Sequence, residues 1–188
     1  MLKKLRLNSA DNLIADDANN RGIICNNQTS KSKEHKAIKM KKTLSRFLAI
    51  QAAYSMLFVQ YESKNSVLLF IREAMKVMAL ANKPDYEFAD QLCLNVFDSI
   101  CLDTNKSSQE FEMLDLDKII SSHLNSNWSI DRVDLLILSV LRVAIIESRF
   151  FSTPHIVIIS EYTTASSYLF EDSSSINFIN AILQNILV

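Results

Sequence analysis

The scarcity of glycine and proline is the feature that most limits the folds open to this chain. Its 188 residues include one Gly and two Pro. Sandwiches and barrels need Gly- or Pro-bearing turns about every ten residues, so β-rich folds are excluded. Gly22 alone also cannot build a phosphate-binding P-loop or a dinucleotide-binding turn. We therefore expect an all-α protein whose turns are made by Ser, Asn and Asp.

Apolar residues repeat at helical spacing from about residue 41 to the end of the chain. The sequence predicts seven helices, at about residues 41–58, 67–81, 85–102, 112–124, 130–148, 154–169 and 176–188. Ser129 and Thr153 are expected to cap the fifth and sixth helices, with Pro154 at the first helical position of the sixth. The apolar run 133–146 contains polar residues and is too short to cross a membrane.

The N-terminal stretch differs from the rest in composition. Residues 1–38 show no helical period and are rich in Asn, Asp, Ser and Lys, so we expect a disordered extension. No apolar stretch of a secretory leader follows the first residues. Residues 39–188 are then expected to form a single helical domain.

The formal net charge of −1 conceals an uneven distribution. Residues 31–46 carry seven Lys and Arg against one Glu, whereas residues 47–188 carry nine basic against 17 acidic side chains. A basic segment therefore precedes an acidic helical body. Such a segment is either a solvated tail or an arm that binds nucleic-acid phosphates, and charge alone leaves both interpretations open.

Side chains that usually build catalytic or metal sites are scattered along the chain. His35, His123 and His155 fall in separate segments without an HExxH pattern, and the three cysteines form no CxxC pair. We therefore expect no metal, no cofactor and no enzymatic activity, and a reduced protein of the cytoplasm. Arg142 on the fifth helix and Glu161 on the sixth are expected to form a structural ion pair.

Four short motifs follow one another over about residues 41–188. They read Arg46-x-x-Ala49-x-Gln51-x-x-Tyr54, then Leu141-Arg142-x-Ala144-x-x-Glu147, then Pro154 with Glu161 seven residues on, then Phe170 with Phe178-Ile179-Asn180-x-x-Leu183. In order and spacing they resemble the motifs of NusB transcription antitermination factors. The chain departs from the family pattern in its Lys-rich leader, and in Ser160, Glu171 and Ala181, which stand where the family has Asn, Gly and Gly.

The resemblance implies a fold of two small helical bundles and a function in RNA binding. NusB proteins bind boxA-type RNA together with NusE, a ribosomal small-subunit protein, and join RNA polymerase during ribosomal RNA synthesis. Carried over by position, the RNA-facing candidates are Lys41, Lys42, Arg46, Gln51, Tyr54, Phe88, Phe170, Ser174 and Phe178. Lys and Arg can hold phosphates, Gln can pair with a base edge and aromatic rings can stack on unpaired bases.

Ordinary structural roles remain open for several of these residues. Gln51 fits a plain helix surface, and Tyr54, Phe88 and Phe178 fit the core. Two functions other than antitermination also remain open. One is a stand-alone relative of the RNA-binding domain found in ribosomal RNA cytosine methyltransferases. The other is a helical protein–protein adaptor whose basic segment only aids solubility.

The role of the residues before Lys41 has two interpretations. Met40 lies where NusB-like sequences usually begin, so we expect residues 1–38 to lie outside the functional domain and outside the native protein. In the rival interpretation, Lys31 to Lys39 extend the RNA-binding arm and become ordered on the nucleic acid.

Overall fold

The computed structural model describes residues 37–77, 83–101, 116–125 and 128–188. The chain divides into two units, residues 1–40 and residues 41–188. In the first unit the described residues, 37–40, are helical and exposed. The disordered extension was predicted for residues 1–38, of which residues 37 and 38 are helical and residues 1–36 fall outside the described part. The domain boundary at residue 38 stays a prediction.

Every regular element that the structure describes is helical, which confirms the predicted all-α class. Residues 41–55 form the first helix of the second unit, here called the leading helix. It is followed by α2 (Lys64–Val77), α3 (Tyr86–Cys101), α4 (Leu116–Ser122), the short 3₁₀ turn η2 (Ile130–Arg132), α5 (Leu135–Phe150), α6 (His155–Leu169) and α7 (Ser173–Leu187). None of the described helices is long and apolar enough to span a bilayer.

Helix α5 begins later than the sequence predicted, because a different residue caps it. The Asp134 carboxylate accepts hydrogen bonds from the backbone N–H groups of Leu136 at 2.7 Å and Ile137 at 3.4 Å. Residues 130–132 form a separate 3₁₀ turn, and the Ser129 hydroxyl donates to Asp131 instead of capping a helix. The prediction that Ser129 caps the fifth helix is therefore wrong.

The ends of three other helices also differ from expectation. Helix α6 begins at His155, with Pro154 in the N-cap position and no side chain bonded there, so the Thr153 cap is wrong. Helix α7 begins at Ser173, where Asp172 accepts from the Ser175 N–H at 2.7 Å. Helix α2 begins three residues early because Ser63 and Ser66 exchange backbone-to-hydroxyl hydrogen bonds at its start.

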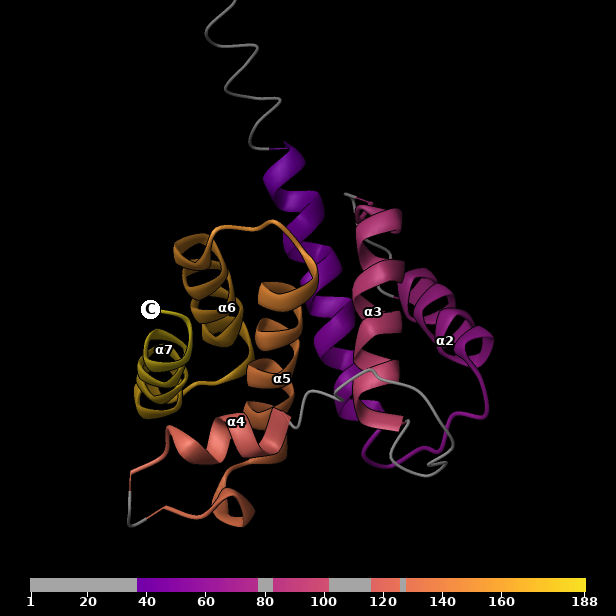
Figure 1. The fold of residues 1–188 in the computed structure, drawn as a ribbon. Coiled ribbons are helices and arrows are strands. Elements are labelled where there is room, and N and C mark those ends of the chain that lie inside the picture. The colour runs from indigo at the N-terminus through magenta and orange to yellow at the C-terminus, as the bar shows by residue number, and fades with distance from the viewer. Residues whose placement is uncertain (1–36, 78–82, 102–115, 126–127) are drawn as a thin grey trace, which may run out of the picture. The chain divides into compact units, whose positions relative to one another are not determined.

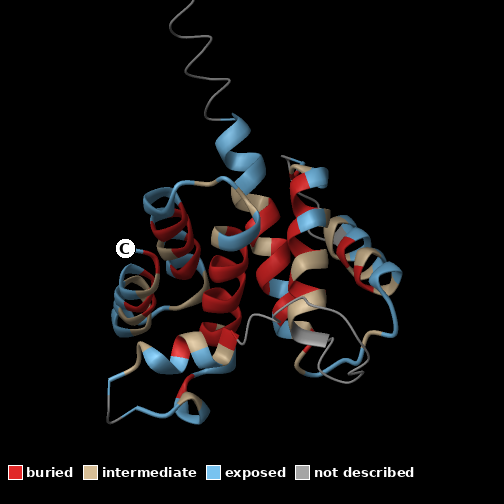
Figure 2. Cartoon of the chain, in the orientation of Figure 1, coloured by how far each residue is buried: buried red, intermediate tan, exposed pale blue. Residues whose placement is uncertain are grey.

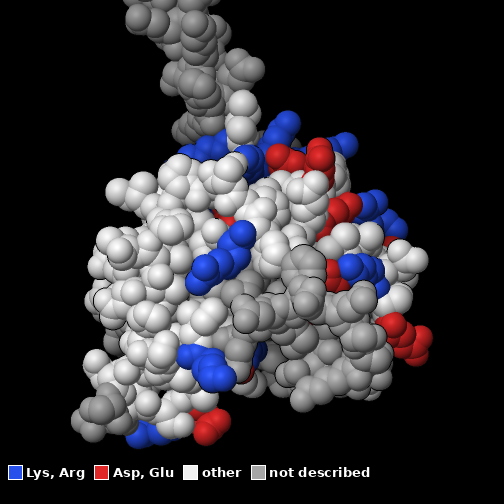
Figure 3. Space-filling view, viewed as in Figure 1, with Lys and Arg blue, Asp and Glu red and all other residues white. Residues whose placement is uncertain are grey.

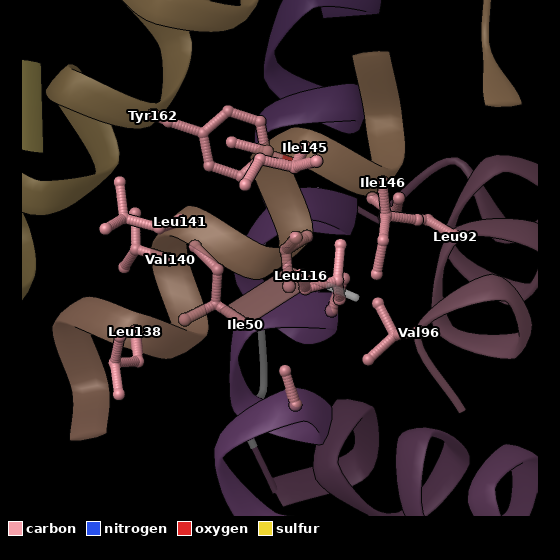
Figure 4. Packing of buried hydrophobic residues seen from close by; sticks show 14 of the residues in the cluster. Ile50, Leu92, Val96, Leu116, Leu138, Val140, Leu141, Ile145, Ile146 and Tyr162 are labelled. Carbon is pink, nitrogen blue, oxygen red and sulfur yellow. The ribbon is translucent and has the colours of Figure 1, made fainter. Parts of the chain in front are cut away.

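The helices of the second unit form two groups that share one core (Figure 1). The leading helix, α2 and α3 make the first group, and α4 to α7 make the second. Helix α5 packs against α3 as well as against α4, α6 and α7. It is buried over most of its length (Figure 2), as expected for an apolar helix surrounded by others. Figure 4 shows Ile146 of α5 beside Leu92 of α3.

Candidate nucleic-acid interface

The leading helix turns one face to solvent. Gln51 and Tyr54 are exposed and Phe47 is half-buried, whereas most residues between them are buried. The three residues lie at i, i+4 and i+7, which places them on one side of an α-helix. We call Phe47, Gln51 and Tyr54 the outer stripe. It offers one amide and two aromatic rings along a single surface.

Aromatic contacts extend the outer stripe at both ends. The Phe47 ring lies 6.4 Å from the ring of Tyr168, which is 74% exposed near the end of α6. The Tyr54 ring meets Phe58 edge-on at 5.1 Å, and Phe58 is exposed. The outer stripe therefore reaches the segment in which the chain passes from α6 to α7. Sequence analysis missed Tyr168, which none of the family motifs includes.

Three predicted residues lie in or after that connecting segment. Phe170 follows the last residue of α6 and is half-buried against the core. Ser174 is exposed in the first turn of α7, where its hydroxyl donates to Asp172 at 2.5 Å. Phe178 stands one turn further along and is half-buried. Ser174 and Phe178 are four residues apart on α7 and so share one face of it.

The predicted basic and aromatic residues do not form one patch. The Lys42 ammonium lies 5.3 Å from the centre of the Phe88 ring, and Phe88 is buried against Phe151. Lys42 and Gln51 are nine residues apart, so they point about 180° from each other around the leading helix. Lys41 and Lys42 are exposed, and basic side chains gather where the leading helix begins (Figure 3). The Lys42–Phe88 contact therefore lies apart from the outer stripe.

Arg46 is not available to RNA, and its assignment as an RNA-facing residue is wrong. Its side chain is 4% exposed, and two of its nitrogens donate to the two Glu147 oxygens at 2.7 and 2.8 Å. A third nitrogen donates to Glu161 at 3.3 Å. A signal for this burial was present, because Ala49, Ile50 and Ala53 follow Arg46 at the spacing of one apolar helix face.

Two hydroxyl groups complete this buried ion-pair cluster of Arg46, Glu147 and Glu161. The Tyr162 hydroxyl donates to Glu147 at 2.9 Å, and the Thr43 hydroxyl donates to Glu161 at 2.7 Å. Burial opposes the charge of Arg46, but the hydrogen bond and the charge of Glu147 outweigh it and raise the pKa of the guanidinium. Burial first, and then the Glu147 carboxylate, raise the pKa of Tyr162 well above its ordinary value. The cluster joins the leading helix to α5 and α6.

The expected ion pair between Arg142 and Glu161 is not formed. Arg142 instead donates to both oxygens of Asp117 at 2.8 Å, which links α5 to α4. Arg142 and Glu147 lie five residues apart, about 140° around α5. Glu147 faces the leading helix and α6, so Arg142 is turned away from the side where Glu161 lies.

A second aromatic contact that sequence analysis missed lies beside η2. The Trp128 ring is 5.5 Å from the Phe178 ring, and the Arg132 guanidinium is 5.9 Å from the Trp128 ring. None of the sequence motifs includes Trp128. As for metal chemistry, the described residues contain no group of three His, Cys, Asp or Glu side chains that could hold an ion.

The all-helical fold and the sequence motifs are similar to those of known NusB proteins. The solved structure of T. maritima NusB superposes with a TM-score of 0.57 and 20% identity, covering 78% of this chain and 89% of that one. Residues 109–188 match the model of the NusB family, and they contain three of the four motifs. The transcription antitermination protein NusB of Enterococcus faecalis (strain ATCC 700802 / V583) is 35% identical over 74 residues.

That match covers 39% of this chain and 47% of the relative, about half of the relative's length. Residues 109–188 are similar to the NusB family in sequence, and the fold of most of the chain is similar to that of T. maritima NusB. The three findings confirm the resemblance to NusB proteins that was drawn from the motifs.

Proposed function

We propose that this protein is a NusB-type transcription antitermination factor that binds single-stranded boxA-type RNA together with NusE in the cytoplasm. NusB proteins are transcription factors and not enzymes, so the proposed role is binding alone. The observation that carries the proposal is the outer stripe and its continuation through Tyr168 toward the start of α7.

The chemistry of this surface suits unpaired nucleotides. The Tyr54 and Tyr168 rings are exposed and can stack on bases, and the exposed Gln51 amide can pair with a base edge. Phe170, Ser174 and Phe178 extend the proposed surface along the α6–α7 connection. Because stacking accepts any base, the Gln51 amide and the Ser174 hydroxyl are the groups proposed to give sequence preference.

Lys41 and Lys42 supply the proposed phosphate contacts. Both are exposed at the start of the leading helix, and the Phe88 ring lies under the Lys42 ammonium. In this proposal Phe88 positions Lys42 and does not itself stack on a base, because its ring is buried. Arg46 anchors the leading helix from inside and contributes no phosphate contact.

The test is the salt dependence of RNA binding. Binding is measured through the fluorescence anisotropy of a labelled boxA-type RNA, with and without NusE. Replacing Lys41 and Lys42 by Gln should flatten the plot of log K against log salt, by roughly 0.7 per lost contact for single strands. Lys76→Gln is the matched control, since Lys76 is an exposed lysine of α2 that pairs with Glu73. An unchanged slope in the double variant would contradict the proposal.

An adaptor without an RNA role is the second candidate. The exposed Phe58 and Tyr54 rings, in edge-on contact, favour it because paired exposed aromatics also suit a protein surface. Binding of NusE in the absence of RNA, with no added anisotropy when RNA is supplied, would support the adaptor. Tighter RNA binding in the presence of NusE would support the antitermination factor.

A further inference from the structure

We propose that Trp128, Phe178 and Arg132 form a stacking platform for one unpaired base of the bound RNA, with Trp128 as the residue that touches it. We call these three residues the Trp128 platform. The inference rests on the proposed RNA-binding function, and it adds Trp128 and Arg132, which no motif of the resemblance includes.

Phe178 forms the floor of the Trp128 platform. Its ring packs partly against the hydrophobic core and lies 5.5 Å from the Trp128 ring at an interplanar angle of 32°. That separation is within the range of favourable aromatic pairs. Trp128 remains 49% exposed, so the contact with Phe178 holds the indole in place and leaves about half of its surface to solvent.

The backbone around Trp128 is held by local hydrogen bonds. The Trp128 N–H donates to the Asn125 carbonyl at 2.8 Å, and the Arg132 N–H donates to the Ser129 carbonyl at 3.0 Å. Arg132, four residues after Trp128, is the last residue of the 3₁₀ turn Ile130–Arg132. Asp131, in the same turn, accepts a hydrogen bond from the Ser129 hydroxyl.

Arg132 supplies the positive charge of the Trp128 platform. Its guanidinium carbon lies 5.9 Å from the Trp128 ring, within the distance of a cation–π contact. The side chain is exposed and has no carboxylate partner among the described residues. A guanidinium beside an exposed indole offers a phosphate contact next to a stacking surface, which is the pairing that proteins use on single-stranded nucleic acid.

Position also connects the Trp128 platform to the proposed RNA surface. Phe178 belongs to both, and Ser174 lies one helical turn before it on the same face of α7. An RNA strand that follows the α6–α7 connection would therefore reach Trp128 at the end of its path. The exposed indole of Trp128, the guanidinium of Arg132 and the nearby hydroxyl of Ser174 together suit one nucleotide of single-stranded RNA.

The experiment uses the fact that Trp128 is the only tryptophan in the chain. The full chain is titrated with labelled boxA-type RNA while anisotropy and indole emission are followed together. We expect the emission to be quenched along the same saturation curve as the anisotropy. An RNA of equal length in which abasic sites replace the bases keeps its phosphates and should not quench. Trp128→Phe serves as the emission blank.

Substitutions separate stacking from packing. Trp128→Leu keeps an apolar side chain on Phe178 but removes the indole face, and should weaken RNA binding about 5- to 150-fold. Arg132→Gln should weaken binding and lower the salt slope by roughly 0.7. Lys76→Gln removes an equal charge from α2 and should leave the RNA affinity and the salt slope unchanged. Unaltered circular dichroism and thermal unfolding of each variant would show that the fold is retained.

The outcomes that would overturn the inference are distinct from those that would overturn the proposed function. The unsubstituted chain could bind RNA tightly by anisotropy without any change in its indole emission, while Trp128→Leu keeps full affinity. That result would overturn the Trp128 platform and leave the proposed function standing. Full quenching of the indole emission by NusE alone, with no further change when RNA is added, would show that Trp128 contacts a protein. That result would also overturn the Trp128 platform. Absence of any RNA binding would overturn both proposals.

Discussion

Arg46 and Glu147 are 101 residues apart in the chain, yet they share two hydrogen bonds of 2.7 and 2.8 Å in the core. The Glu147 side chain is fully buried and that of Arg46 nearly so. Each charge is therefore tolerated inside the protein only because the other is present. This pair, with Glu161, fixes the leading helix on the second group of helices.

Removing Arg46 should destabilise the protein strongly. We expect Arg46→Ala to lower the free energy of unfolding by about 3–5 kcal/mol, since the buried Glu147 carboxylate loses the cation that binds both of its oxygens. Arg46→Lys should recover only part of the lost stability, because an ammonium cannot make the bidentate contact with Glu147. Urea unfolding measures both variants. A loss below about 1 kcal/mol for Arg46→Ala would contradict a buried pair.

Arg142 provides the matched comparison, because its partner is open to solvent. The Asp117 side chain is 48% exposed, so it can be hydrated when Arg142 is replaced. Arg142→Ala should therefore cost less than Arg46→Ala in the same urea titration. Glu161→Gln should leave the Arg142 pair intact, and a double-mutant cycle between Arg142 and Glu161 should show no coupling. Appreciable coupling would restore the pair predicted from the sequence.

Tyr162 makes stability depend on alkaline pH. Its pKa is raised in the folded state, so its contribution to stability is complete below the ordinary value of about 10 and is lost as pH rises above it. Burial also raises the pKa of Cys93, which adds a loss that begins nearer pH 9. We expect urea unfolding to show falling stability above about pH 9.

The variant Tyr162→Phe tests the tyrosine's share of that loss. It should lower stability by about 1.5–3 kcal/mol at neutral pH, because the hydrogen bond to Glu147 disappears. Its stability should then fall less steeply than that of the wild type above about pH 10. Equal steepness in the two proteins would assign the alkaline loss to other groups.

The start of α5 can be tested at two neighbouring residues. Asp134→Ala should cost about 1 kcal/mol, since the carboxylate that caps Leu136 and Ile137 is removed. Ser129→Ala should change stability by less than about 0.5 kcal/mol, because Ser129 caps no helix. Thermal unfolding of the two variants shows which of the two residues caps α5. The reverse order would show that the helix begins where the sequence predicted.

The fold was more predictable than the contacts that hold it together. A chain with one Gly and regular apolar spacing can form little except helices, and the helices lie in the predicted order. The helix starts were less certain, since Ser129 and Asp134 are both good caps and only the turn at 130–132 separates them. That turn depends on where Trp128 and Ile130 pack, which local sequence does not encode.

The partners of the charged residues could not be predicted for a similar reason. Glu161 was the partner expected for Arg142 from the sequence, whereas the pairing with Asp117 depends on how α4 and α6 dock on α5. Arg46 was assigned to RNA because it opens the first family motif and ends the basic segment of residues 31–46. The apolar spacing of Ala49, Ile50 and Ala53 pointed instead to the core. The outer stripe was partly predicted, through Gln51 and Tyr54.

The separation of Arg46 from Glu147 sets a delay during synthesis. The leading helix is translated first, and its arginine has no buried partner until another 101 residues have been added. At a translation rate of about 5–20 residues per second, that interval lasts about 5–20 s. Throughout that interval the face of the leading helix that contacts α5 and α6 has been made but is not yet covered. The nascent chain therefore depends on its last third to enclose its first helix.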